Sequence, residues 1–436
     1  MDLTGKHIAI LGVGRSGRAA ALLALREGAR VSIWDLAGAR AFAEMPAGVE
    51  IHPEATAGQG RDVVSDLLVI SPGIDTCGSY VAAFSAHAGE VIGEVEFAAR
   101  FYQGGIVGIT GTNGKTTTTE LVARILAHAG LGGTPCGNYG TPFAEVVLQA
   151  SPPATVSLEL SSFQLETIRT LRPVVAVWLN FAPDHMDRYP TVDAYRAAKL
   201  RIFENQTPQD TAVIRSGEVL PSLVAGTVTI STTDPGADWF SDGHVILHAG
   251  ETWLDMAHDT ALRGLHNAEN AMAAMAACQA LGIPASTMRE ALHGYAPPPH
   301  RCELIRTLDG VEYLNDSKAT NLHALESALR SQTRPVVLIA GGKDKGLDYE
   351  PVVPLLREKA LATVTFGQIA RPLAALFGEA VPSEPVATLA DAVAAARILS
   401  PHGSTVLLSP GTSSFDQFSG YEQRGNAFRD LVHQLR

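Results

Sequence analysis

Short apolar runs alternate with longer stretches of helical spacing along the first hundred residues. The runs at 7–11, 31–34 and 67–70 have the length of buried strands, and residues 18–27 have the period of a helix. Strands separated by helix-length segments pair in parallel, because the helix returns the chain to the same end of the sheet. The pattern therefore predicts an α/β domain that ends near Gly93.

The same alternation continues toward the C-terminus. A bridging helix is expected at 94–102, and the apolar run at 105–109 opens a second domain. Further strands are expected at 155–160, 174–179, 311–315, 336–340, 363–366 and 405–408, and a long alanine-rich helix at 266–281.

A proline-rich segment at 295–301, YAPPPHR, is the best linker candidate, because its three prolines fix extended backbone and lack amide donors. A chain of 436 residues also exceeds one ordinary core. We therefore expect domains at 1–93, 94–298 and 299–436.

Charge and cysteine content exclude several classes of protein. The chain has 33 Lys+Arg against 45 Asp+Glu, a formal charge of -12, and no basic run, which disfavours binding to nucleic acid or to an anionic membrane. Cys77, Cys136, Cys278 and Cys302 lie too far apart for a disulfide framework or a cysteine zinc site. No apolar stretch reaches the ~18 residues that span a bilayer, and the N-terminus resembles a strand rather than a signal peptide. A cytoplasmic protein without membrane insertion is expected.

The segment 110–119, TGTNGKTTTT, follows a predicted strand and opens a predicted helix. Gly111 and Gly114 allow backbone N–H groups to face anionic oxygens, Lys115 can reach terminal phosphates, and Thr116 can offer its hydroxyl to Mg²⁺. The usual phosphate-loop pattern places its first glycine where Ile109 stands here. A shortened ATP loop is the favoured interpretation, and a glycine-rich turn with an exposed lysine is the alternative.

A second glycine loop, Gly12 to Gly17, reads G-x-G-x-x-G between a strand and a helix, and Asp35 ends the next strand. Such a loop accommodates a nucleotide diphosphate, and the acid can accept a hydroxyl bond. NAD(P) binding is the runner-up interpretation of this domain. The fold class is thus α/β, with a Rossmann-like N-terminal domain, a central P-loop ATPase-type domain and a Rossmann-like C-terminal domain.

Polar residues gather where two strands of the second domain end. Glu159 ends one strand and suits a second ligand for Mg²⁺, while Asp184, His185, Asp187 and Arg188 crowd the loop after the next. That crowding is expected of a metal or substrate site, although a polar loop with local turn bonds is an equal alternative.

Two lysine-containing loops leave strands of the third domain, NDSKATN at 315–321 and GGKDKG at 341–346. They could clamp carboxylates of an anionic substrate, although exposed lysines are also common in turns. A Ser-Pro-Gly sequence ends a strand at 71–73 and again at 409–411, which is where open α/β sheets bind ligands.

Together these motifs resemble the Mur ligase family. The resemblance covers all three predicted domains through TGTNGKTTT, LELSSFQLE, DHMDRY, AAKLRIFE, GLHNAEN, PHRCE, NDSKATN, LSPGTSSFDQF and EQRGN, in that order. LELSSFQLE and DHMDRY favour the branch of the family that adds D-glutamate.

The resemblance implies an ATP-dependent ligation of D-glutamate to UDP-N-acetylmuramoyl-L-alanine through an acyl-phosphate, with release of ADP and phosphate. That reaction belongs to peptidoglycan precursor synthesis, and so to cell wall biogenesis, cell shape and cell division. The cofactors implied are Mg²⁺, as two ions, with ATP as co-substrate. A cytoplasmic monomer is expected. The first domain would then hold a UDP-sugar, and no hydride would be transferred.

The resemblance also assigns roles to single residues of this sequence. The catalytic residues implied are Lys115, His185 and Lys199, with Lys199 carbamylated. The metal ligands implied are Thr116, Glu159, His185 and Lys199. ATP would contact Gly111, Thr112, Asn113, Gly114, Lys115, Thr116, Thr117, Asn270, Arg301 and Asp316. The UDP-substrate would contact Gly14, Arg15, Ser16, Asp35, Ser71, Pro72, Gly73, Asn138, Ser161 and Gln164. D-Glutamate would contact Lys318, Thr320, Lys345, Ser414 and Tyr421.

Three places differ from the family pattern or from some relatives: Leu36, Gly420 and the stretch around Lys343. Leu36 stands where a polar residue often follows Asp35, which leaves the uracil contacts open. Lys343 competes with Lys345 for the side-chain carboxylate of D-glutamate, and spacing favours Lys345. Two other functions stay as alternatives: a dinucleotide-dependent oxidoreductase built on the first glycine loop, and a regulatory nucleotide-binding module without ligation.

Overall fold

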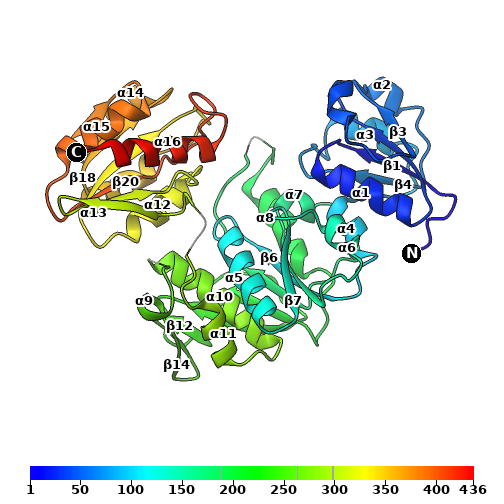
Figure 1. The fold of residues 1–436 in the computed structure, drawn as a ribbon, viewed down its shortest axis with the longest axis horizontal. Coiled ribbons are helices and arrows are strands. Elements are labelled where there is room, and N and C mark those ends of the chain that lie inside the picture. The colour runs from blue at the N-terminus through cyan, green and yellow to red at the C-terminus, as the bar shows by residue number, and fades with distance from the viewer. Residues whose placement is uncertain (187, 263, 297–298) are drawn as a thin grey trace. The chain divides into compact units, whose positions relative to one another are not determined.

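The computed structural model describes residues 1–186, 188–262, 264–296 and 299–436 (Figure 1). Asp187 of the predicted site loop and residues 297–298 of the predicted linker lie outside the described residues, as does the predicted boundary at 298. The described chain divides into two compact units, Met1–Leu254 with Glu269–His293, and Asp255–Ala268 with Gly294–Arg436. Each unit is α/β.

The N-terminal part of the first unit is a parallel sheet of order β3-β2-β1-β4-β5 with helices on its faces (Figure 1). Its elements are β1 (His7–Leu11), α1 (Arg15–Arg26), β2 (Arg30–Trp34), η1 (Ala39–Phe42), β3 (Val49–His52), α2 (Ala57–Gly60), β4 (Leu67–Ile70), α3 (Ser79–Ser85) and β5 (Val91–Gly93). The predicted strands are present. The helix begins earlier than predicted, at Arg15, because Gly14 is its N-cap.

Adjacent strands bring three loops to one edge of this sheet. Leu11 at the end of β1 lies opposite Trp34 of β2 and Ile70 of β4. Since all three strands run parallel, the glycine loop, Asp35 and Ser71 follow strands that end together.

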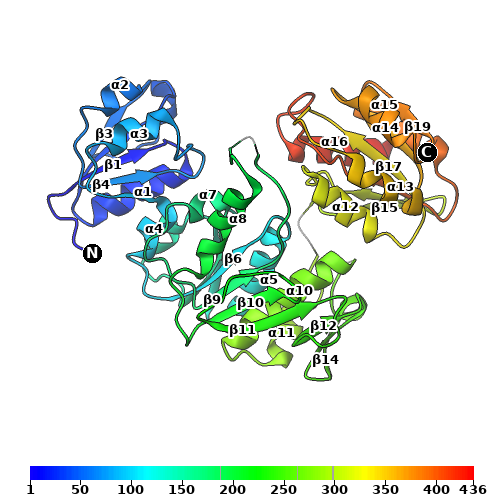
Figure 2. The same cartoon turned by 180° about the vertical axis from the view of Figure 1, so that it is seen from behind.

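A larger sheet of order β14-β13-β12-β11-β10-β9-β6-β8-β7 completes the first unit (Figure 2). Its elements are α4 (Glu94–Ala99), β6 (Gly105–Thr110), α5 (Lys115–His128), β7 (Gly132–Gly137), α6 (Phe143–Val147), β8 (Thr155–Glu159), α7 (Ser162–Leu165), β9 (Val175–Trp178), α8 (Val192–Leu200), η2 (Arg201–Phe203), β10 (Thr211–Arg215), β11 (Gly226–Ser231), β12 (Trp239–Ser241), β13 (Val245–His248), β14 (Glu251–Asp255) and α11 (Ala285–Leu292). The strands β6 to β9 pair in parallel, so their carboxyl ends share an edge.

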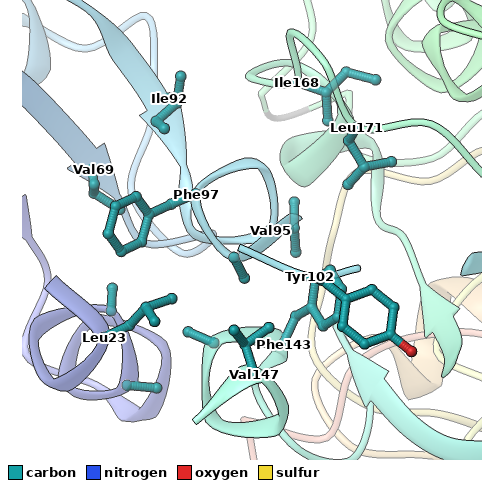
Figure 3. Packing of buried hydrophobic residues seen from close by; sticks show 14 of the residues in the cluster. Leu23, Val69, Ile92, Val95, Phe97, Tyr102, Phe143, Val147, Ile168 and Leu171 are labelled. Carbon is teal, nitrogen blue, oxygen red and sulfur yellow. The ribbon is translucent and has the colours of Figure 1, made fainter. Parts of the chain in front are cut away.

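One hydrophobic core joins the two sheets of the first unit (Figure 3). Leu23 of α1 and Val69 of β4 belong to it, together with Phe97 of α4 and Phe143 of α6. All four side chains are almost completely buried. The bridging helix predicted at 94–102 is therefore present as α4, ends at Ala99, and is part of a shared core rather than a loose connection.

The second unit is built on a sheet of order β15-β16-β20-β17-β18-β19. Its elements are α9 (Met256–Asp259), β15 (Glu303–Leu308), β16 (Val311–Asn315), α12 (Leu322–Arg330), β17 (Val336–Gly341), η3 (Glu350–Val352), α13 (Val353–Lys359), β18 (Ala360–Phe366), α14 (Ala370–Phe377), β19 (Ser383–Pro385), α15 (Leu389–Leu399), β20 (Thr405–Leu408) and α16 (Tyr421–Gln434). The alanine-rich helix α10 (Leu265–Ala280) has residues in both units. Only β15 pairs antiparallel among the pairings described in this sheet.

None of the helices in the described part of the chain is long and apolar enough to cross a membrane.

Candidate active site

The phosphate loop lies between β6 and α5 and is shaped by two glycines. Gly114 caps α5 in the left-handed region, with φ 84°, and a Cβ at this position would lie 2.2 Å from Asn270 Oδ1. The Lys115 ammonium donates to the carbonyls of Gly111 and Thr112 at 2.8 and 2.9 Å. Thr116 is half-buried in the first turn of α5, and Thr117 is buried. The loop thus presents a lysine and a hydroxyl at a helix N-terminus, where anions bind.

Asn180, which follows β9, holds this loop in place. Its Oδ1 accepts from the Asn113 amide at 2.9 Å, and its Nδ2 donates to the Asn113 carbonyl at 3.1 Å. The Thr112 hydroxyl similarly pairs with both backbone groups of Ala182 at 3.0 Å. The loop after β9 therefore fixes the backbone of the phosphate loop before any ligand binds.

Glu159 ends β8 with a buried carboxylate that is only partly hydrogen-bonded. Its Oε1 accepts from Asn138 Nδ2 at 2.7 Å, while its Oε2 has no hydrogen-bond partner among the described residues. The Glu159 side chain is 2% exposed. A buried oxygen without a donor costs free energy unless a cation or a ligand group satisfies it.

Lys199 of α8 is the other buried charge beside the phosphate loop. It is 2% exposed and its ammonium donates to the Gly111 carbonyl at 2.9 Å. Burial, and then the positive charge of Lys115, lower the pKa of Lys199 well below its ordinary value, against the opposing charges of Asp184 and Glu159. Burial and the neighbouring cation thus shift the Lys199 equilibrium toward the neutral amine.

His185 lies in the loop after β9 and adopts a positive φ of 58°. Its ring packs edge-on against Phe163 and Tyr195, with centroids 4.9 and 6.0 Å apart. Tyr195 also lies beneath the Lys199 ammonium, 4.8 Å from the ring centroid. This aromatic group connects the histidine loop to the buried lysine.

The predicted metal ligands belong to the same unit. Thr116 follows β6, Glu159 is the last residue of β8, His185 follows β9, and Lys199 lies on α8. The strands β8, β6 and β9 are neighbours in the sheet. Within the described residues, no group of three or more His, Cys, Asp or Glu side chains is arranged to hold a metal ion. The predicted set differs from a carboxylate cluster, because its four side chains are a hydroxyl, a carboxylate, an imidazole and an amine.

The first glycine loop is closely packed before any nucleotide binds. A Cβ at Gly17 would lie 1.8 Å from the Gly12 carbonyl oxygen, so this helix start tolerates only glycine. Asp35 accepts from the Val13 and Ala37 amides, each at 2.8 Å, so both carboxylate oxygens brace the loops around them. Leu36 beside it is 69% exposed.

The remaining residues predicted to bind the UDP-substrate lie around this loop and around α7. Gly14 and Arg15 are exposed, Ser16 is half-buried, and Arg15 donates to the Gly140 carbonyl at 3.4 Å. A small pocket is lined by Ser71, Pro72 and Gln164, among others.

Gln164, which lines that pocket, has a side-chain N–H₂ group available as a hydrogen-bond donor. Its Oε1 completes a capping box with Ser161, the N-cap of α7, while its Nε2 is buried without a partner in the described part of the chain. Asn138, by contrast, is already bonded to Glu159.

Asp316 and Arg301, predicted to bind ATP, belong to the second unit. Asp316 accepts from the Cys302 amide at 3.2 Å and from the Ser409 hydroxyl at 2.9 Å. Burial raises the pKa of Asp316 to about 7, with those hydrogen bonds and the charge of Arg301 opposing the rise. The residues predicted for ATP are thus divided between the units.

The residues predicted to bind D-glutamate meet at the carboxyl edge of the third sheet. Lys318 places its ammonium 3.8 Å from the centroid of the Tyr421 ring, and Lys345 donates to the Thr320 carbonyl at 3.4 Å. Ser414 is buried in the loop after β20. Two cations and a hydroxyl on one edge suit a dicarboxylate.

Sequence patterns missed the residue that ties these loops together. Arg424 of α16 is fully buried and donates to the Ser317 hydroxyl at 3.0 Å, the Ser317 carbonyl at 2.8 Å and the Thr412 carbonyl at 3.2 Å. Burial lowers the pKa of Arg424 to about 10. The only signal for Arg424 was its place in EQRGN, since its partner loop precedes it by 107 residues.

Asn180 and Tyr195 were also missed as site residues. Asn180 stands at the start of the polar loop after β9, and that strand-end position could have identified it. Tyr195 lies four residues before Lys199, on the same face of α8, which helical spacing could have suggested.

Comparison with known proteins places this site in a family. Residues 109–278 match the model of the Mur ligase middle domain, and residues 300–411 match that of the Mur ligase glutamate ligase domain. A protein named UDP-N-acetylmuramoylalanine--D-glutamate ligase from Anaeromyxobacter dehalogenans is 40% identical over 460 residues, covering 99% of this chain and 98% of that protein. One of the same name from Myxococcus xanthus is 40% identical over 453 residues, covering all of both chains.

Solved structures agree in fold. A pseudomurein peptide ligase type C from Methanothermus fervidus superposes with a TM-score of 0.61 at 16% identity, covering 99% of this chain and all of the other. A UDP-N-acetylmuramate-alanine ligase from Thermotoga maritima gives a TM-score of 0.60 at 19% identity, covering 98% and 99%. With two family models covering most of the sequence and full-length relatives at 40% identity, the chain belongs to the Mur ligase family.

Proposed function

We propose that this protein ligates D-glutamate to UDP-N-acetylmuramoyl-L-alanine, with ATP converted to ADP and phosphate. The observation that carries the proposal is the 40% identity, over the whole chain, to proteins that bear the name of this activity. The proposed domain roles are UDP-substrate binding by 1–93, ATP binding by 94–298 and D-glutamate binding by 299–436.

The phosphate loop would activate the substrate's carboxylate. In the proposed reaction this carboxylate attacks the γ-phosphate of ATP, and the D-glutamate amine then displaces phosphate from the acyl-phosphate. Lys115, which donates to two carbonyls of its own loop, would exchange these bonds for phosphate oxygens. Its charge would stabilise the negative charge that develops on the transferred group.

The buried, unpartnered Glu159 Oε2 supports a cation site beside this loop. Thr116, Glu159, His185 and Lys199 are the proposed holders of two Mg²⁺ ions, which would neutralise phosphoryl charge when bound. A carbamate on Lys199 would convert an amine into a carboxylate ligand. The lowered pKa of Lys199 supports that modification, because CO₂ reacts with the neutral amine.

D-Glutamate would bind at Lys318, Thr320, Lys345, Ser414 and Tyr421. The Lys345 ammonium donates to the carbonyl of Thr320, another residue assigned to D-glutamate, at 3.4 Å. This contact supports Lys345 as the partner of the side-chain carboxylate. A cytoplasmic monomer completes the proposal.

The test measures phosphate release by the purified protein with ATP, Mg²⁺ and UDP-N-acetylmuramoyl-L-alanine, with and without D-glutamate. D-Glutamate should be required for rapid release, and the product should gain the mass of one glutamyl residue. Equal stimulation by another amino acid would contradict the substrate assignment.

Two further measurements separate the alternatives. Saturable NADH or NADPH binding without competition from UDP would favour an oxidoreductase. A regulatory nucleotide-binding module without ligation predicts instead that His185→Ala and Lys199→Ala bind ATP normally and lose no activity. Lys115→Ala should abolish turnover while UDP-substrate binding persists, because the two nucleotides are assigned to different sheets.

A further inference from the structure

A partly buried polar network joins the loop after β4 to the loop after β9. Its centre is Glu166, just after α7, whose Oε2 accepts from the Thr76 hydroxyl at 2.5 Å and from Arg188 Nη2 at 3.0 Å. The other oxygen, Oε1, accepts from the Tyr189 hydroxyl. The side chains of Glu166 and Arg188 are only 18% and 13% exposed. This partial burial strengthens a charge-assisted contact relative to one in open solvent.

The network contacts two loops that bind different substrates in the proposed function. Thr76 follows the Ser71–Ile74 loop, which lies at the proposed UDP-sugar site. Arg188 follows His185 by three residues, and its guanidinium also stacks over the Phe163 ring at 3.9 Å. Phe163 in turn packs against His185 and lines the pocket that contains Ser71.

The two sequence motifs that favoured the D-glutamate branch are thus in direct contact. LELSSFQLE ends at Glu166, and DHMDRY ends at Arg188 and Tyr189. The family resemblance assigns none of these three residues to ATP, the UDP-sugar or D-glutamate. Their hydrogen bonds to one another and to Thr76 give them a positional role instead.

We propose that Glu166 is a positioning residue that holds the Thr76 loop against the His185 loop, and so aligns the UDP-sugar's carboxylate with the ATP phosphates. This inference rests on the proposed function. The alignment matters because a reacting carboxylate must approach phosphorus within a narrow range of distance and direction, and small displacements cost large factors in rate.

The chain contains a matched control with the same three chemical groups. Asp210 accepts from the Thr207 hydroxyl at 2.9 Å and from Arg172 Nε at 2.7 Å. This threonine, carboxylate and arginine set lies just before β10, away from the loops that carry the proposed ligands. Thr207→Val therefore removes an equivalent hydroxyl bond without touching the proposed alignment.

The experiment compares Thr76→Val, Glu166→Gln, the double variant and Thr207→Val in steady-state ligation. Each of the first two should lower kcat/KM for the UDP-sugar by about tenfold and leave KM for D-glutamate within about twofold. The double variant should have a kcat/KM no lower than that of the less active single variant, because both changes break the same network. Thr76→Ser should restore activity, and Thr207→Val should retain it.

A second measurement is independent of turnover. Without substrates, amide hydrogen exchange in residues 71–78 should be faster in Glu166→Gln than in the wild type, and unchanged in Thr207→Val. Faster exchange in Glu166→Gln, combined with a wild type that fails to ligate, would refute the proposed function but support the contact. If the wild type ligates, any of three results would overturn the role of Glu166. These are unchanged exchange in Glu166→Gln, additive losses of kcat/KM in the double variant, and a loss of kcat/KM in Thr207→Val equal to that in Thr76→Val.

Discussion

Glu94 and Glu96, two residues apart on α4, should respond in opposite directions to the same substitution. Glu94 is 1% exposed, its Oε1 accepts from the Ala144 amide at 2.7 Å, and its Oε2 has no partner among the described residues. Burial raises its pKa from 4.5 to about 7, against the backbone hydrogen bonds that lower it. Glu94→Gln keeps an acceptor for Ala144 and removes the ionisable group.

The raised pKa sets both the sign and the size of the effect. A carboxyl group with a higher pKa in the folded state stabilises fully below its unfolded value of 4.5, and that stability is lost as pH rises through about 7. At about 1.4 kcal/mol per pKa unit, the loss reaches roughly 3 kcal/mol by pH 8. Wild type and Glu94→Gln should therefore match near pH 4.5, and the variant should be more stable at pH 8.

Glu96 supplies the control because its carboxylate is well paired. It accepts from Arg100 Nε at 2.9 Å, from the Thr170 hydroxyl at 2.7 Å and from the amides of residues 169–171. Glu96→Gln turns an NH₂ group toward these donors. It should destabilise the protein by about 3 kcal/mol at both pH values, as the loss of a buried partner does.

Urea unfolding followed by tryptophan fluorescence measures this directly. Trp34, Trp178, Trp239 and Trp253 all lie in the first unit, so the signal reports only the unit that contains α4. The midpoint difference between Glu94→Gln and wild type should grow from pH 5 to pH 8 at a constant m-value. A difference that does not change with pH, or a wild type that gains stability relative to the variant, would refute the reasoning.

Three further outcomes are expected. Gly114→Ala should weaken ATP binding at least about tenfold in calorimetry, because φ 84° and the nearby Asn270 oxygen exclude a Cβ, while UDP-substrate affinity serves as the control. Lys199→Arg should reduce phosphate release by about a hundredfold or more, since a guanidinium neither loses its proton nor forms a carbamate; retained activity would show that the reaction needs no carbamate there. Arg424→Lys should raise KM for D-glutamate by about tenfold, because lysine cannot make both guanidinium hydrogen bonds to the hydroxyl and carbonyl of Ser317. An equal rise in KM for the UDP-substrate would indicate general damage to the fold instead.

The sequence predicted the strands that carry the site because their signal is local. The strands β1, β4, β16 and β20 have the predicted bounds. Of these, β1, β4 and β20 are short, mostly apolar runs that pair in parallel with their neighbours. Their loops could be assigned to carboxyl edges by the same logic.

Among the strands that were not predicted, β12 and β14 lack that signal. The strand β14 reads ETWLD and β12 has only three residues, so neither shows a continuous apolar run. Their pairing depends on neighbours in the sheet rather than on local pattern.

Burial of charge was the part of the site that sequence reasoning did not predict. Lys199 reads as an ordinary helical lysine, and its lowered pKa exists only because α8 packs against the phosphate loop. Glu94 likewise resembles a helix-start acid until α6 covers it. Charged residues in short helices give no sequence signal that separates a solvated face from a buried one.

Three of the site loops are held by polar side chains, which explains why the sequence motifs contain residues that contact no proposed ligand. Each loop is held by a polar side chain from a neighbouring segment: Asp35 holds the first glycine loop, Asn180 the phosphate loop and Arg424 the Ser317 loop. Loops fixed in this way lose less conformational entropy when a ligand binds, so more of the contact energy remains for binding and alignment. Asp35, assigned from sequence to a ligand hydroxyl, has both oxygens engaged by backbone amides, and this bracing alone is reason enough for an acid at that position.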